Sequence, residues 1–333
     1  MNIHFITTVR KDRQLLIDFE RKWKDDNSFI TQHTSGSTGS PKAIDIPKWK
    51  FVASAQTTGG FFNFKASENA LLCISPAFIG GKMMYVRSLE FDMNLYVTPF
   101  NRLPLEQLKV PIDFAAMVPL QVSATLREHP EKLNLIRNLI IGGAPVSAQL
   151  EKQLQQFKGI AYSTYGMTET VSHIALRKLN NKGDPYFALG DCRFDTTANQ
   201  ELVIHAPHLK INNLITNDVV HLLDERRFRW LGRSDFTINS GGIKIQPEQV
   251  EKKLADLLPS DAFMIGALPD EQFGSRVVWI GEQRIEGTFD ETAVSNRLEK
   301  YERPKTYFFV EELARTSNGK IDRNRTIALV HER

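Results

Sequence analysis

The segment "TSGSTGSPK", residues 34–42, places hydroxyl side chains, two glycines and a Pro-Lys pair in one short run. Glycine permits positive φ and lets a backbone approach a ligand closely, while Ser and Thr add donors without bulk. Lys42 adds a cation at the end of the run. Such a loop is typical of polyphosphate binding. A flexible polar surface loop is the alternative that a shorter fragment would favour.

Two common phosphate motifs do not fit this run. A Walker loop requires G-x-x-x-x-G-K, but the fifth residue after Gly36 is Pro41. A dinucleotide fingerprint requires G-x-G-x-x-G, and Gly36 and Gly39 do not form it. The segment therefore predicts a phosphate loop of a different class.

The composition of the chain is that of an ordinary globular protein. Its 333 residues are 41% hydrophobic and 24% charged, which suits two or three domains. A net charge of +3 gives no indication of a nucleic-acid or membrane partner. Cys73 and Cys192 lie far apart, so we expect reduced thiols in a cytoplasmic protein rather than a zinc site. The N-terminus lacks the apolar core of a signal peptide, and no apolar run approaches the ~18 residues of a membrane span.

Apolar runs alternate with helical patterns between Ala70 and Gly143. We expect buried strands at residues 71–75, 94–99, 113–119 and 139–143, and crossover helices at residues 120–129 and 146–157. This alternation predicts an α/β domain with a mainly parallel sheet.

The pattern changes at about Asp191. Short antiparallel strands with a hairpin predict a small β subdomain there. The region after residue 232 is expected to form a compact α+β unit, with helices at 247–257 and 291–301 and strands at 262–268, 277–281 and 306–310. The boundary between the two units is predicted near Ser234 and Asp235.

Two further segments carry candidate ligand-binding residues. "GGAPVS", residues 142–147, follows a buried strand, where ligands bind in α/β sheets, although a plain turn explains it equally well. "YSTYGMTET", residues 162–170, supplies Glu169. A carboxylate beside a phosphate loop suits a Mg²⁺ ion, and the alternative is an acid that complements a helix dipole.

Two more segments are ambiguous when taken alone. "TNDVV", residues 216–220, supplies Asp218, which is either an acceptor for ribose hydroxyls or an ordinary turn aspartate. "TSNGKIDRN", residues 316–324, presents Lys320 on a turn, where a solvated surface lysine is the simplest interpretation.

Together and in this order, the segments resemble the adenylate-forming superfamily of acyl- and aryl-CoA ligases, peptide-synthetase adenylation domains and luciferases. The resemblance rests on "TSGSTGSPK", "YGMTET", "TND", "GRSDFTINSGGIKIQPEQVE" and "NGKIDR", spread from residue 34 to 323. It implies an enzyme that joins a carboxylate to AMP, releases pyrophosphate, and passes the acyl group to a thiol, usually that of CoA. ATP, Mg²⁺ and CoA are implied, and the oligomeric state, homo-oligomer or monomer, is left open.

The resemblance assigns roles around ATP. The phosphate loop would hold the β- and γ-phosphates, Gly142 to Ala144 and Tyr165 would flank adenine, and Asp218 and Arg233 would hold the ribose. The implied ATP-binding residues are Thr34, Ser35, Gly36, Ser37, Thr38, Gly39, Lys42, Gly142, Gly143, Ala144, Tyr165, Gly166, Asp218 and Arg233.

It also implies the catalytic and moving parts. Thr168 would contact the α-phosphate, Glu169 would ligate Mg²⁺, and Lys320 would bridge the carboxylate and α-phosphate as their bond forms. Asp235 would be the hinge between an ATP- and acyl-binding domain, residues 1–234, and a mobile C-terminal domain, residues 235–333. Gly241 and Gly242 would leave room for the pantetheine thiol to reach the acyl-adenylate.

Two departures accompany the resemblance. Only 33 residues precede Thr34, where most relatives carry well over a hundred, so we expect a missing or minimal N-terminal subdomain. The ribose motif reads "TND" where many relatives have Thr-Gly-Asp, a change that keeps the aspartate.

The stretch "SPAFIGGKMMYVRSL", residues 75–89, resembles the o-succinylbenzoate–CoA ligases of menaquinone biosynthesis. Phe78 stands where those ligases often have histidine, while Gly81 and Arg87 match their glycine and arginine. Lys82 and Arg87 lie in an otherwise apolar stretch, where a cation is costly unless it is paired. The second carboxylate of o-succinylbenzoate would supply a partner.

Other interpretations of this region stay open. Lys82 and Arg87 would reach the surface if their side chains snorkel. Ser163 and Thr164 are further candidates for the acid pocket. Another acyl or aryl ligase with a different acid or acceptor is the alternative enzyme. A non-catalytic nucleotide-binding relic is disfavoured because Lys42, Glu169, Asp218 and Lys320 are all present.

Overall fold

The computed structural model describes residues 1–33, 43–180, 183–259, 261–316 and 321–331. The predicted phosphate loop, with Thr34, Ser35, Gly36, Ser37, Thr38, Gly39 and Lys42, lies outside the described residues, and so does Lys320. No described helix has the length and apolar character needed to cross a membrane.

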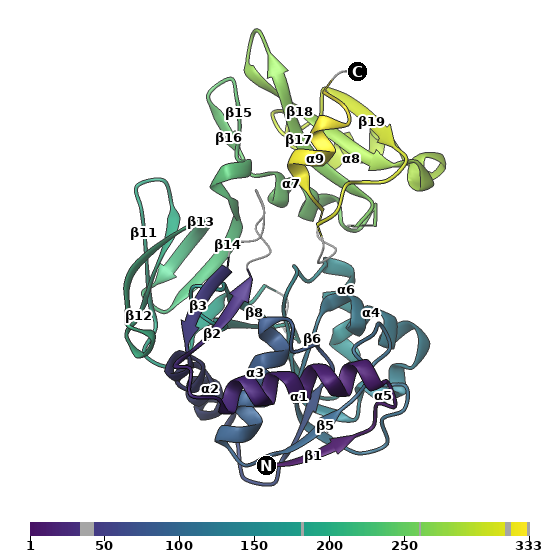
Figure 1. The fold of residues 1–333 in the computed structure, drawn as a ribbon. Coiled ribbons are helices and arrows are strands. Elements are labelled where there is room, and N and C mark those ends of the chain that lie inside the picture. The colour runs from purple at the N-terminus through teal and green to yellow at the C-terminus, as the bar shows by residue number, and fades with distance from the viewer. Residues whose placement is uncertain (34–42, 181–182, 260, 317–320, 332–333) are drawn as a thin grey trace.

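A twelve-stranded sheet forms the large part of the molecule, and its first half is parallel (Figure 1). In spatial order these strands are β1 (Asn2–Phe5), β5 (Asn94–Val97), β4 (Asn69–Leu72), β6 (Ile112–Met117), β7 (Ile136–Ile141) and β8 (Ile160–Gly166). Each pairs in parallel with its neighbour. The predicted α/β class with a mainly parallel sheet is confirmed, with strand ends displaced by a few residues.

Helices cover both faces of this parallel half. The helices are α1 (Arg10–Lys24), α2 (Lys48–Phe62), α3 (Ile79–Glu90), α4 (Pro119–Glu128), α5 (Pro130–Leu133) and α6 (Ala148–Gln153). Successive side chains of a strand point to opposite faces. Accordingly, Phe114 of β6 packs in the cluster that contains residues of α1 to α3, whereas Ala115 packs with residues of α4 and α6. The helix expected at 146–157 ends at Gln153 and continues as a 3₁₀ turn.

The second half of the large sheet is antiparallel. After β8 the order continues with β9 (His173–Lys178), β10 (Tyr186–Ala188), β14 (Arg227–Arg233), β13 (Ile211–Asp224), β12 (Glu201–Ala206) and β11 (Arg193–Thr196). The expected β subdomain therefore continues the same hydrogen-bonded sheet, because β9 pairs antiparallel with β8 at the junction. A separate hairpin of β2 (Phe29–His33) and β3 (Ala43–Pro47) flanks residues 34–42.

The elements after β14 form a smaller lobe, at the top of Figure 1. They are β15 (Ile238–Ser240), β16 (Ile243–Ile245), α7 (Pro247–Leu254), β17 (Phe263–Asp270), β18 (Gly274–Glu282), α8 (Glu291–Arg297), β19 (Thr306–Val310) and α9 (Arg323–Ala328). The 3₁₀ turns of the chain are Leu154–Gln156, Pro207–Leu209, Ser234–Phe236 and Gln283–Thr288. Trp279 is fully buried in this lobe and packs on Phe289, with ring centroids 4.4 Å apart.

Candidate active site

The turn between β8 and β9 carries Thr168 and Glu169. The buried hydroxyl of Thr170 closes this turn, since it accepts from the Met167 N–H at 3.0 Å and donates to the Ser172 carbonyl at 2.8 Å. Glu169 is exposed and makes no hydrogen bond or ion pair with any described residue. An unpaired carboxylate at the carboxyl end of a strand fits a hard cation such as Mg²⁺.

The loop after β7 lies against β8. The predicted adenine site requires this proximity, because it combines Gly142 to Ala144 with Tyr165 of β8. The Gly142 N–H donates to the Met117 carbonyl at 3.1 Å. A Cβ at Gly142 would come within 2.4 Å of the Thr164 hydroxyl, so only glycine fits this approach. Thr164 donates to the Ile141 carbonyl at 3.3 Å, and Ala144 lies in the same loop. Gly143 has a φ of 81°, which glycine tolerates without strain.

Asp218 is held by two aromatic donors. The Tyr165 hydroxyl donates to one carboxylate oxygen at 2.7 Å, and the Trp230 indole N–H donates to the other at 3.0 Å. Burial and the charge of Asp218 raise the pKa of Tyr165, so this phenol keeps its proton. A carboxylate has about four lone-pair sites, so these two donors use only part of its accepting capacity, and contact with ribose hydroxyls stays a prediction. Trp230 was not among the sequence candidates, because it lies twelve residues away on β14.

Arg233 stands opposite Asp218 in the register of β13 and β14. Its guanidinium is bound to Asp235 through two hydrogen bonds, from Nε at 2.9 Å and from Nη2 at 2.8 Å. The pair with Asp235 raises the pKa of Arg233 further. The predicted ribose ligand and the predicted hinge residue are therefore joined in this structure.

Gly241 and Gly242 form the tight turn between β15 and β16. Their φ values are 58° and 83°, the combination that glycine adopts most readily in a two-residue hairpin. A side chain at Gly241 would press on the Phe273 ring at 3.0 Å, while none of the described residues lies within 4 Å of a Cβ at Gly242. The turn thus explains both glycines, and a role in thiol access stays a prediction.

Lys82 and Arg87 are buried within α3, which excludes the snorkelling alternative. Arg87 is 1% exposed and Lys82 is 8% exposed. Lys82 donates to the Gln32 side chain at the end of β2, and burial, together with the charge of Lys22, lowers its pKa to about 8. The close approach of α3 to the preceding loop requires Gly81, because a Cβ there would lie 2.4 Å from the Ile74 carbonyl oxygen.

Arg87 makes contact only with neutral groups among the described residues. Its Nη2 donates to the Ser172 hydroxyl at 3.0 Å and approaches Nδ1 of His173 at 3.5 Å, and its Nε has no hydrogen-bond partner. The guanidinium carbon lies 6.0 Å from the centre of the Phe114 ring. Burial lowers the pKa of Arg87 to about 9, which still leaves the group charged at neutral pH.

Ser163 and Tyr165 of β8 face the antiparallel half of the sheet. The Ser163 hydroxyl is hydrogen-bonded to the Tyr186 hydroxyl at 2.9 Å. The Tyr165 ring packs edge-on against Phe228, with centroids 5.1 Å apart. Gly166 ends the strand where a Cβ would lie 2.2 Å from the Ser172 carbonyl oxygen, so the turn to β9 needs glycine.

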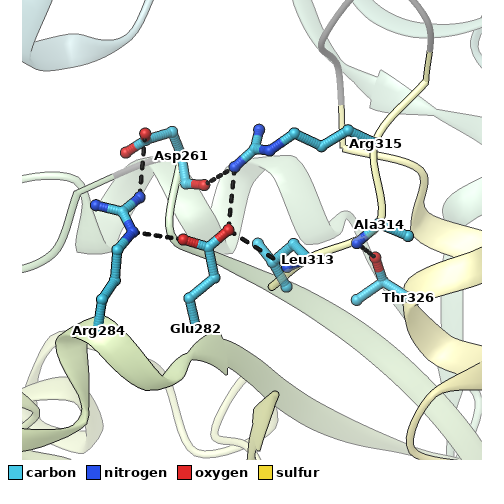
Figure 2. A network of polar contacts seen from close by, with 7 residues as sticks. All are labelled: Asp261, Glu282, Arg284, Leu313, Ala314, Arg315 and Thr326. Atoms are coloured by element: carbon cyan, nitrogen blue, oxygen red, sulfur yellow. Dashed lines mark hydrogen bonds and ion pairs between the residues drawn. The ribbon is translucent and has the colours of Figure 1, made fainter. Parts of the chain in front are cut away.

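A polar network anchors the segment that precedes residue 317 (Figure 2). Glu282, at the end of β18, accepts from the Leu313 N–H at 3.3 Å and from Arg315 at 3.2 Å. Burial opposes ionisation of Glu282, but hydrogen bonds, led by that from Arg284, outweigh it and hold its pKa below the usual value. Arg315 forms an antiparallel β-bridge with Ile321, so these two described residues lie side by side in the small lobe.

Glu248 occupies the junction between α7 and β14. A Cβ at Gly232 would lie 2.5 Å from one oxygen of Glu248 and 2.8 Å from the Gln246 side-chain oxygen, so both oxygens press on that strand. Neither oxygen has a hydrogen-bond partner among the described residues. Burial raises the pKa of Glu248 to about 7, against the opposing charge of Arg323. Glu248 belongs to the motif at residues 232–251, but its burial could not be predicted from that motif.

Glu248→Gln should remove the contribution of this junction to the pH dependence of the free energy of unfolding. A carboxyl whose pKa is raised on folding stabilises the fold below its unfolded pKa of about 4.5, and this stabilisation is lost as the pH rises through about 7. We therefore expect the variant to match wild type at pH 4.5 and to exceed its free energy of unfolding at pH 8 by up to about 3 kcal/mol. Urea denaturation at both pH values measures the difference.

The control for this prediction is Glu311→Gln, which removes an exposed carboxylate of the same lobe. It should leave the pH dependence of unfolding unchanged. Equal pH dependence in wild type and Glu248→Gln would show that Glu248 titrates as an ordinary surface acid.

A second polar cluster lies beside β11 and β12, the last two strands of the large sheet. The side-chain atoms of Asp191, Cys192 and His208 that could ligate a metal lie within 4.8 Å of one another, whereas the spacing of the two cysteines predicted no zinc site. His208 Nδ1 and Asp191 are hydrogen-bonded at 2.6 Å, and burial raises the pKa of the Cys192 thiol to about 12. The hydrogen bond between His208 and Asp191 accounts for this contact, and the cluster shares no residue with the groups around Asp218 or Arg87.

The mainly parallel sheet, the hairpin that flanks residues 34–42, the hydrogen-bonded Asp218 and the small C-terminal lobe agree with the fold expected of an adenylate-forming enzyme. Residues 7–195 match the profile of the AMP-binding enzyme family. The chain belongs to this family, that of the adenylate-forming acyl-CoA ligases, and the predicted class of AMP-forming acid–CoA ligase is confirmed.

Relatives of the chain agree in fold and class. An acyl-CoA synthetase (AMP-forming)/AMP-acid ligase II-like protein from Dyadobacter fermentans is 32% identical, with a TM-score of 0.64, over 96% of this chain and 95% of its own. The 2-succinylbenzoate–CoA ligases of Listeria monocytogenes and Bacillus cereus are 25% and 26% identical, over 91% and 90% of this chain and 70% of each relative. The o-succinylbenzoate coenzyme A synthetase of Bacillus subtilis, solved with ATP and magnesium ion, shares the fold at 20% identity and a TM-score of 0.74, over 89% of this chain and 69% of its own.

Proposed function

We propose that this enzyme activates o-succinylbenzoate with ATP and transfers the acyl group to CoA. The observation that carries the substrate is Arg87, a buried cation with no carboxylate partner among the described residues. An unpaired buried charge is expensive, and a second carboxylate on the substrate would pair with it. The names of the curated relatives from Listeria monocytogenes and Bacillus cereus support the same substrate.

The first half-reaction forms an acyl-adenylate. A carboxylate oxygen of the succinyl group attacks the α-phosphorus of ATP, and the bond from that phosphorus to the β-phosphate bridging oxygen breaks, releasing pyrophosphate. We assign Lys320 to the developing charge at the attacking carboxylate and the α-phosphate, Thr168 to the α-phosphate, and the loop Thr34 to Lys42 to the leaving phosphates. Preorganised charge of this kind carries most of the catalysis in such transfers.

Asp218 and Arg233 are proposed to hold the ribose, and the loop Gly142 to Ala144 is proposed to face adenine with Tyr165. The preset hydrogen bonds from Tyr165 and Trp230 support the first role, because they fix the Asp218 carboxylate before the nucleotide binds. A fixed acceptor loses little conformational entropy on binding.

Mg²⁺ would be held by Glu169 together with phosphate oxygens, and the ion would neutralise charge on the leaving pyrophosphate. The exposed, unpaired carboxylate supports this assignment. An ion of this kind usually keeps several waters and only one or two carboxylates, so a single protein ligand is sufficient.

The second half-reaction forms the thioester. The thiol of CoA gives up its proton, its sulfur attacks the acyl carbon, and the bond from that carbon to the AMP oxygen breaks. We propose that residues 235–333 act as a mobile domain, that Asp235 is the hinge, and that the turn at Gly241 and Gly242 borders the thiol path. In support, the large sheet receives no described strand after β14, which ends at Arg233.

A panel of acids assayed with ATP, Mg²⁺ and CoA tests the substrate. The panel is o-succinylbenzoate, 4-phenyl-4-oxobutanoate (which lacks the ring carboxylate), benzoate, acetate and a medium-chain fatty acid. We expect a strong preference for o-succinylbenzoate in pyrophosphate release and in thioester formation, because only this acid carries a second carboxylate beside its ring.

Two other results would change the proposal in different ways. A preference for fatty or simple aryl acids would refute the substrate and leave the ligase class intact. Adenylation of o-succinylbenzoate without transfer to CoA would instead place the acyl group on another acceptor, such as a carrier-protein thiol or an amine.

A further inference from the structure

Arg87 lies at one end of a buried chain of neutral hydrogen-bonding groups. The chain runs from Arg87 on α3 to His173 at the start of β9, and then to Thr58 and Ser54 on α2. All four residues are buried, and His173 is 6% exposed. Three elements that are far apart in the sequence therefore meet at the His173 ring.

The hydrogen bonds of this chain assign the tautomer of His173. The Thr58 hydroxyl lies 3.0 Å from the Ser54 carbonyl, which only accepts, so the single proton of Thr58 is donated there. The same hydroxyl lies 3.2 Å from Nε2 of His173, and because its own proton is already donated, its oxygen accepts a hydrogen bond from Nε2–H. The ring proton is accordingly on Nε2, and the lone pair of Nδ1 faces Arg87.

The charge state of the ring follows from the same contacts. A protonated His173 would present an Nδ1–H to the guanidinium N–H groups at 3.5 Å, which combines a donor–donor clash with like-charge repulsion. Burial, and then the charge of Arg87, hold the pKa of His173 well below its usual value. The ring therefore orients the guanidinium without neutralising it.

We propose that His173 is a positioning residue for acid selectivity: as a neutral Nε2–H imidazole, it orients Arg87 toward the second carboxylate of the acid substrate. The proposal rests on the proposed function, since it presumes that Arg87 binds that carboxylate. A carboxylate partner in place of His173 would cancel the charge that the substrate needs, while an apolar residue would leave Nη2 of Arg87 with the Ser172 hydroxyl and without the second acceptor that Nδ1 supplies. The neutral imidazole of His173 carries no negative charge and still offers an acceptor, so it suits the role.

Three substitutions of His173 separate the two sides of its ring. His173→Asn keeps a polar atom close to the position of Nδ1, facing Arg87, and loses the contact with Thr58. His173→Gln reaches the position of Nε2 and keeps Thr58, but places no acceptor where Nδ1 lies. His173→Leu removes both contacts at similar volume.

The measured quantity is the ratio of kcat/KM for o-succinylbenzoate to that for 4-phenyl-4-oxobutanoate. We expect His173→Leu and His173→Gln to lower this ratio about 10- to 100-fold, the usual effect of losing a hydrogen bond to a charged group. The loss should fall mainly on KM for the diacid, with the monoacid changed little. His173→Asn should restore most of the ratio.

A second readout does not depend on activity. In ¹⁵N NMR of histidine-labelled enzyme, we expect His173 to be neutral with its proton on Nε2, and Thr58→Val should abolish this tautomer preference. An equal fall of both acids in His173→Leu, or a diacid preference that survives this substitution, would overturn the proposal.

The failure of the proposed function has a different signature from the failure of this inference. If wild type shows no preference for the diacid over the monoacid, the substrate assignment and the role of His173 are both refuted. If wild type shows the preference and His173→Leu retains it, only the role of His173 is refuted. Folding of each variant is checked by its thermal unfolding without ligand.

Discussion

Lys320→Ala should lose acid adenylation by a factor of ~10²–10³ or more, the typical value of a preorganised group that stabilises developing charge. The same variant should still convert a supplied acyl-adenylate and CoA to the thioester. The first half-reaction builds charge between the carboxylate and the α-phosphate, where the resemblance places this lysine. The second half-reaction breaks the bond to AMP and, in the proposed domain arrangement, uses the segment of Gly241 and Gly242 instead.

The two half-reactions are measured separately. Adenylation is followed by pyrophosphate release from ATP and the acid, and thioester formation by consumption of synthetic acyl-adenylate in the presence of CoA. Lys300→Ala is the matched control, because Lys300 is an exposed lysine of the same lobe. Similar losses in both half-reactions of Lys320→Ala would point to damage of the lobe and remove Lys320 from the chemistry.

Local patterns were sufficient to predict most of the fold. The run at residues 113–119 is apolar after Asp113, as expected of a strand that is covered on both faces, and β6 covers most of it. The strand predicted at 306–310 coincides with β19. The predicted helix 291–301 ends early, at Arg297, because Leu298 adopts an extended backbone. Helix ends depend on capping geometry more than on periodicity, which makes them hard to place from sequence.

The candidate site was predictable only in part, for a physical reason. Motifs locate residues such as Asp218 and Arg233 along the chain, but hydrogen bonds between distant elements decide their state. The pair of Arg233 with Asp235 and the two donors on Asp218 arise from strand register and packing. His173 lies three residues after the quoted segment 162–170 and was not a sequence candidate, because its partner Arg87 lies 86 residues away.

The environment of Lys82 and Arg87 likewise could not be predicted from local sequence patterns. The sequence left two outcomes for Lys82 and Arg87, burial with a partner or extension to the surface, because periodicity in a nearly all-apolar helix does not orient its polar residues. In the structure α3 packs against both the parallel strands and α2, so both side chains are enclosed. Burial without an acidic partner among the described residues is the feature that turns a structural arginine into a candidate ligand-binding one.

Arg87→Ala should erase most of the advantage of o-succinylbenzoate over 4-phenyl-4-oxobutanoate. Removing one partner of a desolvated ion pair typically costs about 3–5 kcal/mol, which is roughly two to four decades in kcat/KM. The monoacid has no carboxylate for Arg87, so its kcat/KM should change little. Removing the ring carboxylate from the substrate and removing Arg87 from the enzyme should therefore cost similar amounts, and the double change should cost little more than either alone.

Arg87→Met separates charge from packing. It keeps a long apolar stem in the enclosed space, whereas Arg87→Ala leaves a cavity. Because Arg87 has no acidic partner among the described residues, Arg87→Met should unfold at the same temperature as wild type or higher, while it loses the diacid preference as fully as Arg87→Ala. A diacid preference that survives both substitutions would keep the proposed substrate and move the carboxylate contact to another cation. Lys82, buried on the same helix and hydrogen-bonded to Gln32, would then be the residue to replace next.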